Sequence, residues 1–485
     1  MPTNSDLTDY ETISRSPRSK FQRANVSGEG WINTSKQPLA STVVDPGLAT
    51  VNSHKVKVKN RGIDTSKIGE TKTPEKLAER WLLKRGHTLT YAGLFLFTAM
   101  VYFRPYELFP SLDWLSKSAF WIALATIAMY IPTQLALENR ITVRTREVKY
   151  VLLLLLAAFL SIPLALEPLR AWTGFAEYMK VIFIFIVLVN AVRTRRRLNL
   201  IILLVLVSSC ILSVMAVNDY RMGKLGMVGV RIQGAIGGLF DNPNDLALHL
   251  VTMIPIAIGM LLGSRGGKKL FFLATAILMV AGVVVTFSRG GFLGLCAAVG
   301  VLSWRVAHQN RWLVALCLPV FMVLFIFLAP GGYGTRMATT NDDSATARTD
   351  DLKRSIFIAS HHPLLGVGFN NYILFSNTDH ASHNAYTQVA SELGTPAMIC
   401  YIIFLIAPIK ELRRIARQTF SNRRQSKFYY MAVGLEASLT GYMVSSFFGS
   451  VAFLWYAYYI VGYAVCLRCL FRTSAESDLA EKFVE

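Results

Sequence analysis

Two arginines of this chain stand where they could hold an anion. Arg289 lies in the segment Ser288–Gly291, between two apolar runs, and Arg231 precedes the segment Phe240–Asp245. A guanidinium group binds phosphate oxygens in a bidentate manner, and the two glycines after Arg289 would let a diphosphate approach the backbone. A boundary arginine can equally extend to the lipid headgroups, so both interpretations of Arg289 are open on these residues alone.

The segment Phe240–Asp245 also has the pattern of a turn followed by a helix start. Pro243 fixes the turn, and Asn244 or Asp245 can cap the helix that follows. A free helix N-terminus suits a phosphate or a sugar hydroxyl. A simple helix cap is the alternative interpretation.

His383 and Asn384 stand at the end of a long polar segment. A histidine there could serve as a general base or as a hydrogen-bond donor near neutral pH. The histidine pairs His361/His362 and His380/His383 lack the spacing of a convincing zinc site, so we expect no metal ion.

The composition of the chain is that of a polytopic membrane protein. Of its 485 residues, 53% are hydrophobic and only 16% are charged, which is unlike a soluble multidomain protein. Lys and Arg total 50 against 30 acidic residues, a net charge of +20. Much of this excess lies in short loops and in the N-terminal segment, so we attribute it to membrane topology and not to nucleic-acid binding. The six cysteines lie inside or at the edges of apolar runs, which argues against a disulfide framework.

Apolar runs long enough to cross a membrane begin after residue 85. Residues 1–85 are polar without periodicity, and we expect a disordered, basic cytosolic tail. A spanning helix needs roughly 20 apolar residues. About twelve such runs follow: 88–103, 118–136, 149–166, 179–192, 198–217, 246–263, 270–287, 291–307, 312–329, 386–409, 429–447 and 450–470. The run 386–409 contains Glu392, Gly394 and Pro396, so it is a candidate for a kink or a later start. Residues 473–485 would form a cytosolic C-terminal tail, and Glu436 should face the bundle interior because a buried charge is costly in lipid.

The distribution of basic residues sets an orientation. With the N-terminus inside, the cytosolic connections hold the basic clusters 140–149, 193–197, 265–269, 305–311 and 410–427, as the positive-inside rule requires. Both termini are then cytosolic. Arg231, Arg289 and His383 all fall on the extracytoplasmic face, the last of them in the long loop 330–385 between the ninth and tenth runs.

Taken in order, these segments resemble the O-antigen ligase/polymerase superfamily. The resemblance covers about residues 225–400 and is carried by Arg231 with Phe240–Asn244, Thr286–Gly291, Arg348, His362–Phe369, His383–Tyr386 and Glu392–Gly394. It implies an all-α membrane glycosyltransferase of the GT-C type over residues 86–472, inverting, independent of metal ions and without a cofactor. The implied donor is a glycan on undecaprenyl diphosphate, used at the outer face of the bacterial inner membrane.

The resemblance also implies roles for individual residues. Arg231 and Arg289 resemble the arginines that hold the donor diphosphate, and His383 resembles the histidine beside the reacting centre. Whether His383 deprotonates the acceptor or binds phosphate is left open. Asn242, Asn244, Ser288, Arg348 and Asn384 are the substrate-binding candidates.

The sequence leaves the acceptor and the exact role open. The acceptor could be another lipid-linked glycan, as in a polymerase of O-antigen or exopolysaccharide working with a chain-length regulator. It could also be a lipopolysaccharide core on lipid A, as in a ligase. A transporter or lipid-glycan flippase is the alternative function, although no repeat relates the two halves of the chain. A scaffold of an envelope-polysaccharide complex is a third possibility.

Overall fold

The described part of the protein is helical throughout. The computed structural model describes residues 86–108, 110–224, 232, 240, 242–307, 343–376, 381–423, 426 and 428–482, and these residues form one compact unit without a β-strand. The elements before the long loop are α2 (Thr88–Phe103), α3 (Pro105–Leu108), η2 (Pro110–Leu115), α4 (Ser118–Glu138), α5 (Arg146–Ser161), η3 (Ile162–Leu164), α6 (Pro168–Ala191), α7 (Arg195–Arg221), α8 (Pro243–Gly263), α9 (Gly267–Val285) and α10 (Arg289–Val306). Those that follow are α13 (Asp343–His361), η4 (Tyr372–Phe375), α14 (Ala385–Leu393), α15 (Thr395–Gln418), α16 (Tyr429–Ser445), η5 (Ser446–Phe448) and α17 (Trp455–Lys482).

Seven of the described helical segments are long and apolar enough to span a membrane. They are Ser111–Glu138, Arg146–Leu164, Pro168–Ala191, Arg195–Arg221, Pro243–Gly263, Gly267–Val285 and Thr395–Gln418. The number is smaller than the roughly twelve expected from the sequence. Helices α2 and α16 coincide closely with predicted runs but have only 16 and 17 residues. The predicted run 312–329 lies outside the described residues.

Two predicted runs differ from the helices in the structure. The run 386–409 is two helices, because the chain breaks at Gly394, which adopts a φ of 88° between α14 and α15. The run 179–192 belongs to a helix of 24 residues, α6, that begins at Pro168. Charged residues had concealed the first turns of this helix.

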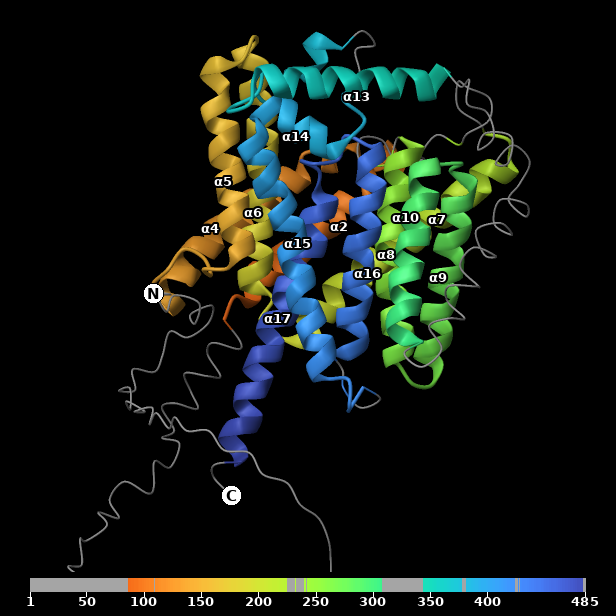
Figure 1. Cartoon of the computed structure of the whole chain (residues 1–485). Coiled ribbons are helices and arrows are strands. Elements are labelled where there is room, and N and C mark those ends of the chain that lie inside the picture. The colour runs from red at the N-terminus through yellow and green to blue at the C-terminus, as the bar shows by residue number, and fades with distance from the viewer. Residues whose placement is uncertain are drawn as a thin grey trace, which may run out of the picture. The chain divides into compact units, whose positions relative to one another are not determined.

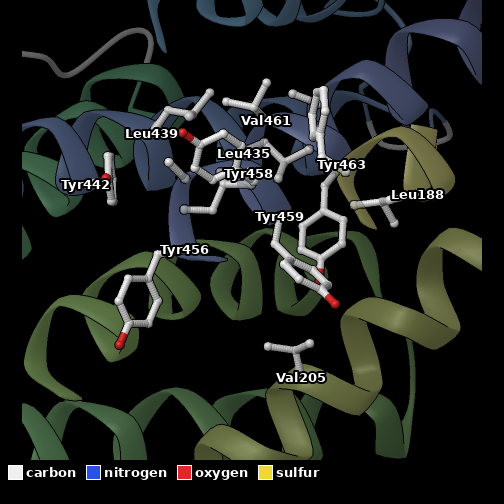
Figure 2. Close-up of a cluster of buried hydrophobic side chains, with 14 of the residues drawn as sticks. Leu188, Val205, Leu435, Leu439, Tyr442, Tyr456, Tyr458, Tyr459, Val461 and Tyr463 are labelled. Atoms are coloured by element: carbon white, nitrogen blue, oxygen red, sulfur yellow. The ribbon is translucent and has the colours of Figure 1, made fainter. Parts of the chain in front are cut away.

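Helix α17 forms the centre of the bundle. Its tyrosines are buried with aliphatic side chains of α6, α7 and α16 (Figure 2). The hydroxyl of Tyr458 bonds to that of Tyr178 at 2.9 Å, and the hydroxyl of Tyr459 to that of Thr98 at 2.8 Å. Because lipid supplies no hydrogen-bond partners, such internal bonds satisfy polar groups in a membrane protein. The helix extends past residue 472, where we expected the C-terminal tail to begin.

Buried acids toward one end of the bundle are paired with arginines. Glu147, at the start of α5, accepts two bonds from Arg468 of α17 at 2.9 and 3.0 Å. Glu436 of α16 accepts bonds from Arg305 and Arg413 at 2.8 and 2.7 Å, and its burial agrees with the sequence expectation. These pairs connect α5 to α17 and α16 to both α10 and α15.

The opposite end of the bundle carries the long loop. Helix α13 lies across this end, while the C-terminal part of α17 projects from the other (Figure 1). Helix α13 contains Arg348 and Arg354, and it ends at His361 before the turn that contains Gly366 and Gly368. Gly366 and Gly368 of that turn have φ values of 63° and 102°, in the left-handed region that favours glycine.

Candidate functional site

The starts of α8 and α10 are joined by a side-chain hydrogen bond. Asn242 caps α8, and its Oδ1 accepts from the N–H of Asn244 at 2.9 Å. Ser288 caps α10, and its Oγ accepts from the N–H of Gly291 at 3.2 Å. The Ser288 hydroxyl also donates to Oδ1 of Asn244 at 2.9 Å. Arg289, the first residue of α10, therefore begins its helix beside the first turn of α8.

The glycines after Arg289 have a packing role. A Cβ atom on Gly290 would lie 2.7 Å from Cβ of Phe448 in η5, and one on Gly291 would lie 2.7 Å from Cβ of Ala247 in α8. The carbonyl of Gly290 also accepts a bond from Ser445 at 3.1 Å. The interpretation that these glycines leave room for a diphosphate is therefore wrong, because protein atoms fill that space. They allow α10 to pack closely between α8 and η5.

The start of α14 is fixed to the connection between η5 and α17. His383 adopts a φ of 50°, and its N–H donates to Oγ of Ser450 at 2.7 Å. Asn384 caps α14, its Oδ1 accepting from the N–H groups of Tyr386 and Thr387 at 2.9 and 3.1 Å. His383 thus stands directly before a capped helix N-terminus.

The last turn of α16 and η5 join the α10 start to the α14 start. Ser445, at the end of α16, bonds to the carbonyl of Gly290. The hydroxyl of Tyr386 donates to the carbonyl of Met443 at 2.8 Å, and Ser446 donates to the same hydroxyl at 3.4 Å. The structure therefore brings Ser288 and Arg289 to the same end of α16 as His383 and Asn384.

Three helix starts, and two polar side chains without a partner in the described part of the chain, lie at this end of the bundle. The first turns of α8, α10 and α14 each carry the partial positive charge of a helix N-terminus. Among the described residues, Nδ2 of Asn384 and Oε1 of Gln388 are buried without a hydrogen-bond partner. They lie one helical turn apart and supply a donor and an acceptor, the two functions that a sugar hydroxyl can use.

The turn after α13 is docked onto the other end of α14. The N–H groups of Val367 and Gly368 donate to the carbonyls of Ser391 and Glu392 at 2.9 and 3.1 Å. The carboxyl of Glu392 accepts from the N–H of Asn370 at 3.0 Å. Burial raises the pKa of this carboxyl to about 8, while the bond from Asn370 acts in the opposite direction.

The remaining predicted residues are placed only in part. Arg348 lies partly buried in α13, the helix that packs on α14. Arg231 lies outside the described residues. Within the part of the chain that the structure describes, no group of three or more His, Cys, Asp or Glu side chains is arranged to hold a metal ion.

Sequence reasoning missed the contribution of the segment Ser445–Ser450. Its residues hold the α10 start and the backbone of His383, yet none was a candidate. A signal was present, because Ser, Ser, Gly and Ser interrupt the apolar residues between two predicted spans. Gln388 was also missed, since a glutamine in a helix start carries no distinctive pattern.

One protein-family model matches part of the chain. Residues 274–402 are similar to the O-antigen ligase family. The matched region extends from α9 to the start of α15, so it includes Ser288, Arg289, Arg348, His383 and Asn384. The comparison with curated proteins gives no match. The protein is therefore a multi-pass membrane protein, and its residues 274–402 resemble a family of membrane glycan transfer of the ligase or polymerase type on lipid-linked glycans.

Proposed function

We propose that the protein transfers a glycan from undecaprenyl diphosphate to an acceptor hydroxyl at the extracytoplasmic face of the bacterial inner membrane. The transfer inverts the anomeric centre and uses no metal ion. We favour polymerisation of O-antigen or exopolysaccharide over ligation to a lipid A core, and we expect a chain-length regulator as a partner. The long loop and the candidate site share one face in this proposal, and both termini are cytosolic.

One observation carries the proposal. The helix start with Arg289 is hydrogen-bonded to the start of α8, and the end of α16 connects both to the start of α14 with His383. Residues as far apart in the sequence as Asn242 and Ser450 thus lie at the same end of the bundle. The chemistry of glycan transfer needs such a place, because the leaving diphosphate develops negative charge as the sugar–phosphate bond breaks.

The proposed roles follow from the chemistry of each group. Arg289, together with Arg231, binds the diphosphate and stabilises its developing charge. The partial positive charge of the helix starts adds to this field. His383 stands beside the reacting centre.

The substrate-binding candidates have two kinds of role. Asn242, Asn244, Ser288 and Asn384 hold the helix starts in position, and Asn384 also offers its Nδ2 to the glycan. Arg348 contacts the glycan from α13.

The direct test is removal of the two central side chains in cells. We expect Arg289→Ala and His383→Ala to abolish high-molecular-weight surface glycan, measured by gel electrophoresis of the extracted polymer. The donor lipid should accumulate in the membrane. Arg265→Ala is the matched control, because Arg265 is an exposed arginine in the connection between α8 and α9, at the opposite end of these helices.

Two results would contradict the proposal. Normal polymer in Arg289→Ala or His383→Ala cells, with the variant proteins present in the membrane, would exclude the site. Movement of lipid-linked glycan across proteoliposomes without new glycosidic bonds would instead favour a flippase.

A further inference from the structure

Asp245 is a carboxylate without a partner at the candidate site. It lies in the first turn of α8, next to Asn244, and its side chain is only partly buried. Among the described residues, no group donates a hydrogen bond to this carboxylate and no Lys or Arg pairs with it. The acids Glu147 and Glu436 of the same bundle are buried and paired with arginines. Asp245 therefore differs from them in being partly exposed and in having no cation beside it among the described residues.

Two buried tyrosines, Tyr442 and Tyr456, lie close enough to Asp245 for its charge to affect them. They lie toward the same side of the buried tyrosine cluster (Figure 2). Their hydroxyl groups carry no charge, so they do not neutralise the carboxylate.

A helix dipole offers a simpler account of Asp245. An acid in the first turn of a helix is stabilised by the partial positive charge there. Glu147 occupies the same kind of position in α5, and there the protein adds an arginine. In a capping box, the acid would also accept a bond from the backbone of the cap residue, which Asp245 does not do in the described structure. The dipole alone leaves the accessibility of this carboxylate unexplained.

We propose that Asp245 is the general base that accepts the proton of the acceptor hydroxyl. This inference rests on the proposed function and adds a catalytic residue to it. The acceptor O–H bond breaks as its oxygen forms a bond to the anomeric carbon, and the proton passes to a carboxylate oxygen of Asp245. The bond between that carbon and the phosphate oxygen breaks at the same time. Undecaprenyl diphosphate leaves with the electron pair, and the proton is later released to solvent.

The position of Asp245 suits an inverting displacement. Neighbouring residues on a helix point about 100° apart. Asn244 is bonded to Ser288 beside Arg289, so Asp245 projects in a different direction from the same turn. An inverting reaction needs its base and its leaving group on opposite sides of the anomeric carbon. Asp245 can therefore approach the sugar from a direction that differs from that of Asn244 and the diphosphate.

The test separates binding from turnover in the full-length protein reconstituted in liposomes. The donor is the lipid-linked glycan that accumulates in Arg289→Ala cells, and the readout is release of undecaprenyl diphosphate. Binding of undecaprenyl diphosphate is measured separately with purified protein in detergent. We expect Asp245→Asn to bind it like wild type and to turn over about 10²- to 10⁴-fold more slowly. Asp245→Glu, which keeps a carboxylate, should recover part of the rate.

Matched variants make the outcome specific. Arg289→Ala should lose binding, whereas Asp219→Asn, which removes a carboxylate from the end of α7, should keep both binding and turnover. Full turnover by Asp245→Asn would overturn the inference. So would joint loss of binding and turnover, or failure of this isosteric variant to fold, since each would assign Asp245 a structural role. If wild type neither binds undecaprenyl diphosphate nor releases it, the proposed function itself fails.

Discussion

Single residues at the candidate site adopt backbone conformations that side chains disfavour. His383 and Phe287 have φ values of 50° and 51°, and they directly precede the caps Asn384 and Ser288. Left-handed conformations of such residues cost on the order of 1–3 kcal/mol each, and they persist only where the surroundings impose them. The bond from His383 to Ser450 is one such constraint. Strain of this kind is typical of sites that hold a side chain in a fixed direction.

Glu392 predicts a pH dependence of stability. Its folded pKa of about 8 lies above the ordinary value of 4.5, because burial disfavours the charged form. A raised pKa contributes stability that is fully present below pH 4.5 and lost as the pH rises through about 8. We expect the thermal midpoint of the purified protein to fall between pH 5 and pH 9. Glu392→Gln should flatten this dependence, and an unchanged slope in that variant would show that Glu392 is not responsible.

At the scale of elements, close packing of α10 against α16 sets the position of Arg289. A Cβ atom on Gly294 would lie 2.8 Å from the carbonyl oxygen of Gly441 and would collide with the hydroxyl of Ser445. One on Gly441 would lie 3.0 Å from Cβ of Ala298. Small residues allow such approach between membrane helices, where packing replaces the hydrophobic effect.

Gly294→Ala should therefore destabilise the protein. Overpacking of a tight contact costs about 1–3 kcal/mol, and it would shift α10 with Arg289. The expected result is a lower thermal midpoint together with reduced polymer in cells. Gly267→Ala is the matched control, because nothing lies within 4 Å of the added Cβ atom. Equal midpoints for the two variants would refute the packing role of Gly294.

The sequence predicted the existence of individual helices better than the residues at which they begin. The run 88–103 coincides with α2, because no charged residue interrupts it and Arg104 follows directly. The first turns of α6 were missed because Arg170 and Glu177 interrupt the apolar residues before position 179. In the structure each of them pairs with a residue three positions away, Arg170 with Glu167 and Glu177 with Lys180. Local pairing cancels charge in a way that a count of apolar residues does not detect.

The sequence predicted which residues belong to the candidate site, but not the contacts that join them. From the sequence alone, the distribution of basic residues and the resemblance to the O-antigen ligase/polymerase superfamily indicated Ser288, Arg289 and His383. The bonds that join them come from Ser445 and Ser450, which are distant in sequence and chemically ordinary. Such contacts depend on how α10, α14 and α16 pack, and helix packing is not encoded in any single segment.

At the scale of the whole molecule, the buried ion pairs and α13 lie at opposite ends (Figure 1). Glu147 and Glu436 meet their arginines on the side away from α13, where the starts of α5, α16 and the ends of α10 and α15 lie. Glu436 is paired with two arginines, Arg305 and Arg413, so this group of three side chains has a net positive charge. Basic ends of membrane helices remain in the cytosol, which supports an extracytoplasmic α13.

Thiol labelling in intact cells tests this orientation. Lys353→Cys places a thiol on the exposed face of α13, and Lys268→Cys places one at the exposed start of α9. A membrane-impermeant maleimide should label Lys353→Cys in intact cells and Lys268→Cys only after permeabilisation, with wild type as the background. The reverse pattern would place the candidate site in the cytosol and would exclude the proposed topology.

The attachment of the turn after α13 determines which residues of this region can vary in sequence. Val367 and Gly368 meet Ser391 and Glu392 through main-chain groups, which every amino acid except proline supplies. Only the two glycines are restricted, because a Cβ atom on Gly366 would lie 2.3 Å from the carbonyl carbon of Glu392 and one on Gly368 would lie 2.3 Å from Cβ of Ala165. The sequence of α13 before the turn can therefore vary while these glycines keep the turn attached to α14.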